Sequence, residues 1–328
     1  MYSILFYLIF SFFLLIFTFK ISKFFKFYDL PNKIKIHKHK VPNIAGLGLL
    51  PLGIFIIIFN GDDQKISFTL FLFIIVVIIG LIDDIKNIKP QLKILFLLIP
   101  VVIFSNSVFT VHSLGNYENL NLQLGSFSLI FTILCILLLT NSFNYLDGID
   151  GLLSLNLIIT FIYFLIIDYE SVKFIKAFIC FLIIYLLFNL NFFKLFPKQF
   201  LGDSGSLSLG FLVSTLLIIV TQSGKYIHPS IIIWPVAFVV YEFLTINILR
   251  LKLKQNIFKR DLNFIFNILD RKFNFNTSII FCNLLHILFC IIGLIINNYE
   301  LHSISILLFI IFFIIYCSLR LIFFVNQK

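Results

Sequence analysis

Residues 124–168 read LGSFSLIFTILCILLLTNSFNYLDGIDGLLSLNLIITFIYFLIID, which is two apolar runs separated by the polar stretch Asn141–Leu152. Each run is close to the length of a membrane-spanning helix, about 20 mainly apolar residues. The polar stretch holds two asparagines and two aspartates, and a glycine follows each aspartate. A carboxylate at the edge of the hydrocarbon core is costly unless it is paired, hydrated or bound to a cation, so we interpret the stretch as functional. The alternative is a solvated loop between two helices.

The composition indicates the class of protein. Hydrophobic residues make up 60% of the chain and charged residues only 12%, which leaves too little polar surface for a soluble globular protein. The apolar runs lack the strict alternation of an outer-membrane barrel. The sequence therefore predicts an all-α polytopic membrane protein, with one integral membrane domain over residues 1–328. Eleven apolar runs lie near 2–21, 44–60, 66–82, 92–110, 124–142, 152–168, 173–190, 205–222, 230–250, 277–297 and 303–323.

The first run and the cysteines disfavour a cleaved signal peptide and a cysteine-based scaffold or metal site. Residues 2–21 have no basic residue before them and no small-residue cleavage site after them, so we expect a retained span rather than a signal peptide. The five cysteines all lie in apolar runs without a CxxC pair, which disfavours structural disulfides and a cysteine-ligated metal.

Lysine and arginine predict the orientation. With the amino terminus outside, 21 of the 25 basic residues fall on the inner side and 4 on the outer side. Basic residues are enriched in cytoplasmic loops, so the carboxyl terminus is expected in the cytoplasm of a multi-pass protein of the cell inner (plasma) membrane. The net charge of +10 suits anionic headgroups and anionic substrates, while the absence of a soluble basic domain disfavours nucleic-acid binding. This orientation places the polar motifs on one cytoplasmic surface.

Two of these motifs contain basic residues that are candidates for phosphate binding. Asp83 and Asp84 end one apolar run, and since adjacent carboxylates repel, we expect partial protonation or a cation between them. Lys93 begins the next run and is expected to fold back across from the carboxylates, where it would hold a phosphate or simply form an ion pair. In the first inner loop, His37 stands among lysines, which suits either a phosphate contact or binding to anionic lipid.

The stretch Gly202–Ser206 reads GDSGS and opens another apolar run. Small residues with free amide groups at a helix start form an anion-binding end, and Asp203 there can carry a hard cation that bridges to phosphate. Mg²⁺ prefers a few carboxylate oxygens together with substrate phosphates, which separate acidic motifs can supply. The alternative is an ordinary helix cap by Asp or Ser.

Together, and in this order, the motifs resemble the polyprenyl-phosphate N-acetylhexosamine-1-phosphate transferases, the glycosyltransferase group 4 superfamily. The resemblance is greatest to the branch that starts O-antigen, enterobacterial common antigen and teichoic acid linkage units. It implies Mg²⁺-dependent transfer (Mn²⁺ is possible) of a sugar 1-phosphate from a UDP-N-acetyl sugar to a polyprenyl phosphate such as undecaprenyl phosphate. The products would be a polyprenyl-diphosphate sugar and UMP. The matching motifs, over about residues 25–270, are Asp29–Asn32 with Lys35–His37, Asp83–Asp84 with Lys93, Asn141–Leu152, Phe200–Ser206, and Pro235 with Glu242 and Arg250.

The resemblance also implies roles for the matching residues. Asp203 would be a Mg²⁺ ligand with Asn144 nearby, while Asp83 and Asp84 would position or deprotonate the lipid phosphate. Lys93 and His37 would hold phosphate oxygens. The implied catalytic residues are Asp83, Asp84, Asp147, Asp150 and Asp203. The implied substrate-binding residues are His37, Lys93, Asn141, Asn144, Ser204, Arg250 and Asn267.

The late inner loop departs from the family pattern. Many relatives carry an Asp followed by a His-x-His-His cluster, whereas residues 260–267 read RDLNFIFN. The resemblance places sugar and diphosphate recognition in this loop, so we expect a less polar pocket that tolerates a 6-deoxy sugar. Two other classes stay open: a binding homologue that has lost catalysis, and a membrane transporter. A transporter should show internal repeats or helices broken at the midplane.

Overall fold

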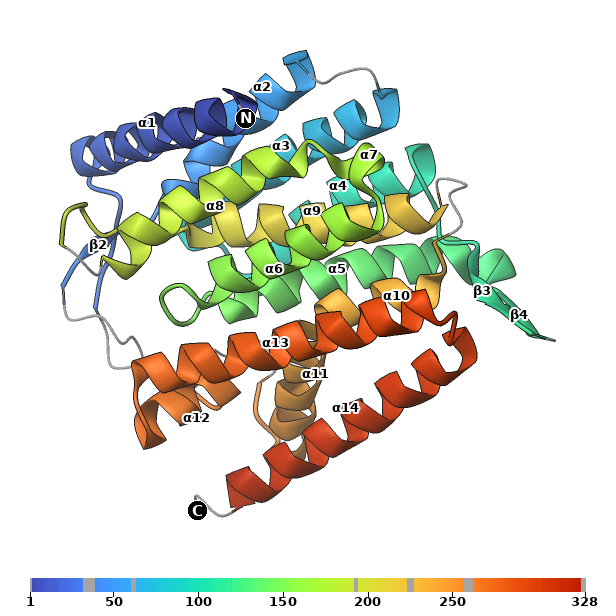
Figure 1. Cartoon of the computed structure of the whole chain (residues 1–328). Helices are drawn as coiled ribbons and strands as arrows, with labels where there is room; N and C mark the ends of the chain where they lie inside the picture. Colours follow the sequence, from blue (N-terminus) through green and yellow to red (C-terminus); the bar gives the residue numbers. More distant parts are fainter. Residues whose placement is uncertain are drawn as a thin grey trace. The chain divides into compact units, whose positions relative to one another are not determined.

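The computed structural model describes residues 2–31, 39–59, 63–118, 120–191, 194–222, 227–256 and 262–325. In this part of the chain, every apolar run of the sequence falls on helical structure (Figure 1). Eight of the described helices are long and apolar enough to cross a membrane, and shorter apolar helices cover Ala45–Phe59, Leu152–Ile167 and Ile175–Leu190. The prediction of an all-α polytopic membrane protein is therefore confirmed. The number of spans and their orientation stay predictions.

The chain forms two compact units. The first comprises Met1–Thr110 and Leu129–Val220, and the second comprises Val111–Ser128 and Thr221–Lys328. The prediction of one domain over the whole chain stays a prediction.

The first unit contains the helices on which the acidic motifs lie. A two-residue antiparallel strand pair, β1 with β2, and a short 3₁₀ helix, η1, connect α1 to α2. The elements are α1 (Tyr2–Phe25), β1 (Tyr28–Asp29), β2 (Val41–Pro42), η1 (Ala45–Gly48), α2 (Leu49–Phe59), α3 (Gln64–Lys86), α4 (Pro90–Ser107), α5 (Ser128–Leu146), α6 (Leu152–Ile167), α7 (Tyr169–Val172), α8 (Ile175–Leu190) and α9 (Gly202–Gln222).

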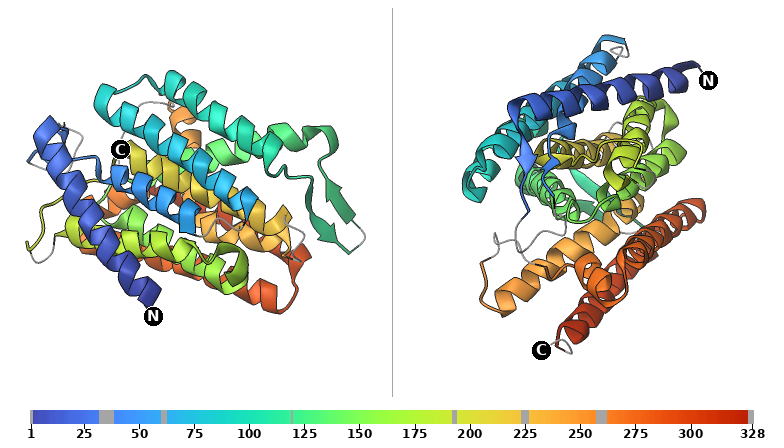
Figure 2. Two further views of the ribbon diagram at one scale, coloured as in Figure 1. Left: turned by 90° about the horizontal axis from the view of Figure 1, so that it is seen from above. Right: turned by 90° about the vertical axis from the view of Figure 1, so that its left-hand side faces the viewer.

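Helix α9 forms the centre of the first unit. It is almost entirely buried, and Figure 2 shows it enclosed by the blue and green helices of this unit. Its small residues permit this, because a Cβ added at Gly210 would lie only 3.0 Å from the Thr140 carbonyl oxygen of α5. Larger side chains fill the remaining space, as where the Phe211 ring meets the Phe104 ring of α4. The start of α9, which carries Asp203, is thereby held inside the bundle.

Two helices extend further into the polar motifs than their apolar runs indicate. Helix α5 continues to Leu146, so half of the stretch Asn141–Leu152 is helix and only the remainder is a turn. The side chains of Asn141 and Ser142 donate to carbonyl oxygens one turn earlier, which lets polar residues continue the helix. Helix α3 likewise continues to Lys86 and includes the aspartate pair. The first half of Asn141–Leu152 is therefore helical, which does not fit the alternative of a solvated loop for that half.

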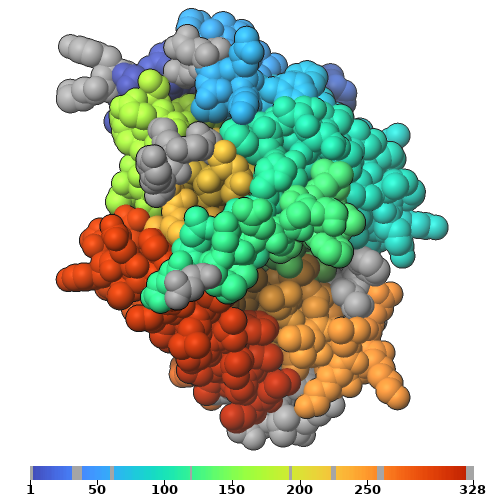
Figure 3. All heavy atoms as spheres, turned by 90° about the vertical axis from the view of Figure 1, so that its right-hand side faces the viewer, coloured from blue at the N-terminus to red at the C-terminus, as the bar shows by residue number. Residues whose placement is uncertain are grey.

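The second unit contains a β-hairpin and the C-terminal helices. The predicted run 230–250 is interrupted, because Pro235 lacks a backbone N–H and lies in a short 3₁₀ helix. The hairpin and the short helix α12 were not predicted. Figure 3 shows the green hairpin beside the red C-terminal residues of the same unit. The elements are β3 (Ser113–Tyr117), β4 (Leu120–Gln123), η2 (Gly125–Phe127), α10 (Pro229–Ile232), η3 (Trp234–Val236), α11 (Ala237–Lys252), α12 (Ile265–Lys272), α13 (Phe275–Asn298) and α14 (His302–Val325).

Candidate active site

Lys93 lies between two carboxylates of the first unit. Its Nζ is 2.5 Å from Oδ2 of Asp83 and also pairs with Asp203. Helix α3 ends just after Asp83, where Asn87 takes a left-handed conformation (φ 49°), and Pro90 then begins α4. This short connection brings the first turn of α4 back toward the end of α3. The predicted approach of Lys93 to the aspartate pair is confirmed for Asp83, and its contact to phosphate stays a prediction.

Asp84 has a different partner from its neighbour. Its Oδ1 accepts a hydrogen bond from the Asp203 amide (2.7 Å), and its Oδ2 accepts one from the Ser204 amide (3.0 Å). The first amides of a helix have no partner within the helix and favour negative charge. The start of α9 therefore binds an anion as expected, but that anion is a carboxylate of the protein. Of the two adjacent aspartates, Asp83 is the one that contacts the Lys93 ammonium group, which also pairs with Asp203.

Asn144 links the end of α5 to the same cluster. Its Nδ2 donates a hydrogen bond to Oδ1 of Asp203, at 3.2 Å. The predicted proximity of Asn144 and Asp203 is confirmed. We call Asp83, Asp84, Lys93, Asn144 and Asp203 the acidic centre.

Glycines allow the backbones around the acidic centre to approach closely. Gly202 has φ +75°, and a Cβ there would lie 2.2 Å from the Asn43 carbonyl oxygen and 2.6 Å from Oδ2 of Asp84. At Gly80, on α3, a Cβ would lie 2.5 Å from the Asp203 carbonyl oxygen. Both separations are below any ordinary contact, so a side chain at either position would push the elements apart.

Replacing Gly80 by alanine is expected to lower the melting temperature of the detergent-solubilised protein by several degrees. Alanine favours a helix, so a loss of stability would come from the contact with α9. Overpacking of this kind costs about 1–3 kcal/mol. The matched control is Gly53→Ala on α2, where the added Cβ would meet a side-chain atom, Cγ1 of Ile74, at the longer distance of 3.3 Å. Equal melting temperatures for the two variants would contradict the close approach of α3 and α9.

The turn Asp147–Gly151 follows α5 and carries the two other predicted aspartates. The Asp147 amide donates to the Asn144 carbonyl oxygen (3.3 Å), and Asp150 forms an ion pair with Lys198. Gly151 has φ +77°, and its amide donates to Oδ1 of Asn189 (2.6 Å). The turn is thus fixed by polar partners from the end of α8 and the segment after it.

The remaining predicted site residues do not belong to the acidic centre. Asn141 donates to a carbonyl oxygen of its own helix, and Ser204 is fully buried with its hydroxyl on the Leu201 carbonyl oxygen. Arg250 and Asn267 are buried in the second unit, which is described separately, so no distance joins them to the acidic centre. His37 lies outside the described residues. The substrate roles of these residues stay predictions.

Sequence reasoning missed Lys198, Asn189 and Gln199. Lys198 counted only as one of the inner basic residues, although it stands five positions before Asp203. Asn189 lies near the end of the apolar run 173–190, Gln199 lies between that run and the next, and both are buried. A buried polar side chain needs a hydrogen-bonding partner, but the sequence does not indicate which one.

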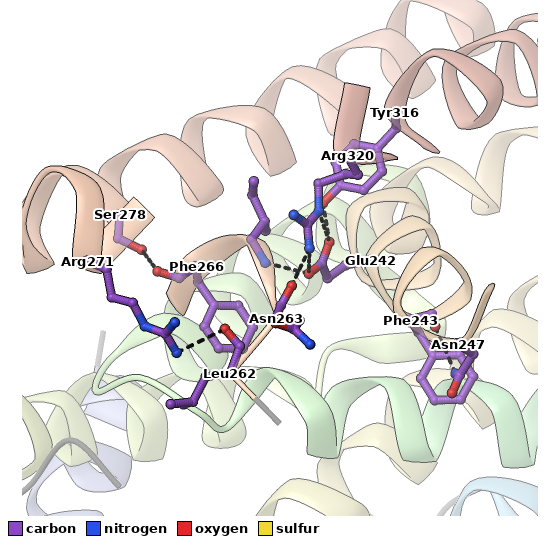
Figure 4. A network of polar contacts seen from close by, with 11 residues as sticks. Glu242, Phe243, Asn247, Leu262, Asn263, Phe266, Arg271, Ser278, Tyr316 and Arg320 are labelled. Carbon is purple, nitrogen blue, oxygen red and sulfur yellow. Dashed lines mark hydrogen bonds and ion pairs between the residues drawn. The ribbon is translucent and has the colours of Figure 1, made fainter. Parts of the chain in front are cut away.

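The second unit contains a buried ionic network (Figure 4). Glu242 of α11 accepts hydrogen bonds from the Ile265 amide (2.6 Å) and from the Tyr316 hydroxyl (2.5 Å). Arg320 of α14 pairs with Glu242 at 3.2 Å and donates to the Asn263 carbonyl oxygen at 2.5 Å. Glu242 and Arg320 are each 2% exposed. The network fixes the start of α12, which lies in the divergent late loop.

The chemistry of the acidic centre suits a hard cation. Carboxylates of Asp83 and Asp203 converge on the Lys93 ammonium group, which shows that the site accepts positive charge. Carboxylate and amide oxygens are the ligands that Mg²⁺ prefers. Among the described residues, no three His, Cys, Asp or Glu side chains are grouped to hold a metal by themselves. A Mg²⁺ ion here would need further oxygen ligands, which substrate phosphates supply in many Mg²⁺ sites.

Comparison with known proteins shows which family and which proteins this chain resembles. The acidic centre lies within residues 66–221, which match glycosyl transferase family 4. Several similar proteins are named undecaprenyl-phosphate alpha-N-acetylglucosaminyl 1-phosphate transferase. That of Yersinia pestis is 27% identical over 253 residues, covering 74% of this chain and 69% of the relative. That of Escherichia coli K12 is 27% identical over 267 residues (78% and 72%). That of Thermotoga maritima is 27% identical over 247 residues (75% and 74%).

The fold and the acidic centre thus define a multi-pass helical membrane protein with a glycosyl transferase family 4 region. The resemblance to the polyprenyl-phosphate N-acetylhexosamine-1-phosphate transferase superfamily, expected from the sequence motifs, is confirmed.

Proposed function

We propose that the chain transfers an N-acetylhexosamine 1-phosphate from a UDP-sugar to a polyprenyl phosphate and so initiates a cell-surface glycan. The observation that carries this proposal is the convergence of Asp83 and Asp203 on Lys93, with Asn144 hydrogen-bonded to Asp203. The relatives that match over most of this chain are named for the same type of transfer, with undecaprenyl phosphate as acceptor. The apolar helices are long enough to cross a membrane, which is where a polyprenyl phosphate acceptor lies.

In the proposed reaction, an oxygen of the polyprenyl phosphate attacks the sugar-bearing phosphorus of the UDP-sugar. A new P–O bond forms, the bond to the UMP oxygen breaks, and UMP leaves with the electron pair. A phosphate monoester carries most of its second negative charge near pH 7. The protein therefore needs mainly to neutralise the repulsion between two anions and to align them in line.

The geometry supports separate roles for the residues of the acidic centre. Asp203 and the amide oxygen of Asn144 would hold Mg²⁺, which would neutralise phosphate charge when bound. Asp83 would position the lipid phosphate, and Lys93 would exchange its carboxylate partners for phosphate oxygens. Asp84 holds the start of α9, which supports a positioning role for it. Asp147 and Asp150 would contact the nucleotide or organise their turn.

The proposed location is the cell inner membrane, with the acidic centre facing the cytoplasm. The support is the distribution of basic residues, 21 on the inner side against 4 on the outer side. UDP-sugars would then reach the site from the cytoplasm, and the lipid phosphate would reach it from the bilayer.

The test uses purified protein in detergent with Mg²⁺, undecaprenyl phosphate and a panel of UDP-N-acetyl sugars. UMP release and a lipid-linked sugar are expected, and EDTA should stop the reaction until Mg²⁺ or Mn²⁺ is added back. Binding of a UDP-sugar without UMP release would indicate a homologue that has lost catalysis. No release with any sugar, together with substrate flux in vesicles, would indicate a transporter.

The late loop predicts the choice of sugar. Phe264 and Phe266 stack with ring centroids 5.1 Å apart, and both rings are buried. A sugar bound beside these rings would leave none of their groups without a hydrogen-bond partner when its 6-hydroxyl is missing, because phenyl rings carry no hydrogen-bonding group. We expect UDP-FucNAc or UDP-QuiNAc type donors to be used at least as well as UDP-GlcNAc in competition kinetics. A preference for UDP-GlcNAc of about tenfold or more in kcat/KM, equivalent to about 1.4 kcal/mol, would contradict this.

A further inference from the structure

Two buried carboxamides in the first unit form a continuous chain of hydrogen bonds. Oδ1 of Asn189, at the end of α8, accepts from the Gly151 amide at 2.6 Å. Its Nδ2 donates to the Gln199 carbonyl oxygen at 3.0 Å. Asn189 is only 4% exposed and Gln199 only 1%. The Asp147–Gly151 turn and the segment before Asp203 are thereby joined through one side chain.

The Gln199 side chain extends the chain of hydrogen bonds to α1. Its Nε2 donates to the Leu15 carbonyl oxygen at 3.1 Å, and its Oε1 accepts from the Thr18 hydroxyl at 3.2 Å. Thr18 is fully buried. Both ends of the Gln199 carboxamide are therefore bound to the first helix of the chain, more than 180 positions earlier.

The segment that follows Gln199 leads directly into the acidic centre. The Phe200 amide donates to the Pro42 carbonyl oxygen (2.7 Å), and the Leu201 carbonyl oxygen accepts from the Gly46 amide (2.9 Å). The next two residues are Gly202 and Asp203. Gln199 is therefore connected along the backbone to the start of α9 and, through Asn189, to the turn that carries Asp150.

Apolar packing already joins the same helices without these amides. The Phe12 ring of α1 meets the Phe188 ring of α8 at 6.1 Å between centroids. The carboxamides add directional hydrogen bonds between these helices. A buried donor or acceptor that loses its partner costs free energy, so these bonds favour one arrangement. Their hydrogen bonds end on the Asp147–Gly151 turn and on the segment before Asp203, which is the arrangement expected of a positioning device.

We propose that Asn189 and Gln199 are positioning residues for the sugar-phosphate transfer, and that α1 is their anchor through Leu15 and Thr18. This inference rests on the proposed function. In this arrangement, the amides hold the aspartates of the turn and Asp203 in fixed relation, and neither amide needs to touch a substrate. Loss of the connection should lower kcat while KM for both substrates changes little.

The test compares two buried threonines of the same unit, Thr18→Val and Thr215→Val. Each hydroxyl can donate its one proton to a carbonyl oxygen of its own helix, but of the two only the Thr18 hydroxyl can donate it instead to Oε1 of Gln199. We expect Thr18→Val to lower kcat about 3- to 10-fold, the range for one lost buried hydrogen bond, with KM within about twofold. Thr215→Val should leave both constants unchanged. Gln199→Met, which removes both side-chain bonds, should lower kcat by more than Thr18→Val does.

Amide hydrogen exchange, read by mass spectrometry, gives a second measurement that does not depend on turnover. Peptides that cover residues 145–152 and 199–206 should exchange faster in Thr18→Val and Gln199→Met, but not in Thr215→Val. Equal effects of the two threonine variants on kcat and exchange would overturn the inference, as would activity lost only in proportion to unfolded protein. If the wild-type protein releases no UMP from any UDP-sugar, the proposed function fails. The exchange measurement then decides alone whether the amides fix the turn and the start of α9.

Discussion

Asp203→Asn is expected to abolish turnover while the protein stays folded and inserted in the membrane. Asparagine keeps the shape of aspartate but removes the negative charge that faces Lys93 and Asn144. A neutral amide binds Mg²⁺ far less well than a carboxylate does. We expect UMP release to fall below about a tenth of the wild-type rate, a barrier increase of more than about 1.4 kcal/mol.

The matched control for this variant is Asp63→Asn. Asp63 caps the start of α3, where its carboxylate accepts from the Lys65 and Ile66 amides. Asparagine is an equally good helix cap, so activity and melting temperature should be unchanged. Size-exclusion profiles and melting temperatures of both variants test folding independently of turnover. Asp203→Asn protein that retains more than about a tenth of the rate would show that Asp203 is not an essential ligand.

Arg320→Met is expected to cause the largest loss of stability. The replacement leaves the Glu242 carboxylate in a site only 2% exposed, without its cationic partner. Breaking one side of a buried ion pair costs about 3–5 kcal/mol, because the remaining charge is uncompensated. Unfolding in detergent, followed by temperature or by added SDS, measures the effect. The double variant Glu242→Met/Arg320→Met should recover part of the loss, since it buries no charge.

The control for this prediction is an exposed ion pair. Lys173 lies 3.9 Å from Glu170, and the two side chains are 59% and 75% exposed. Such pairs contribute about 0–1 kcal/mol, so Lys173→Met should unfold almost like the wild type. A loss for Arg320→Met as small as that for Lys173→Met would mean that Glu242 is not held by Arg320.

The helices and part of the acidic centre could be predicted because they depend on local sequence. An apolar run near the thickness of a bilayer predicts a helix without knowledge of its neighbours. Lys93 is separated from Asp84 by only a short loop, so its return to the carboxylates follows from chain length. The meeting of Asn144 with Asp203 came from the family resemblance rather than from distance along the chain.

The different environments of Asp83 and Asp84 could not be predicted. Successive residues on a helix point about 100° apart, so each aspartate faces a different neighbour. Which neighbour depends on how α3 packs against α9, and that packing depends on Gly80 of α3 and on Gly202, which lies far along the chain. Arg320 was missed for the same reason, because it stands 78 positions after Glu242. The break at Pro235 was a local feature, and the length of the apolar run outweighed it.

The hydrogen bonds from the start of α9 to Asp84 also affect the order in which the acidic centre assembles during synthesis. Asp84 precedes the two amides that it binds by 119 and 120 positions. Because synthesis proceeds from the amino terminus, α3 leaves the ribosome well before α9 exists. Until then, the Asp84 carboxylate has no helix start to bind, so the acidic centre can form only late in biogenesis. A nascent chain truncated before Gly202 should therefore contain both aspartates of α3 and still lack the arrangement that holds Lys93 between Asp83 and Asp203.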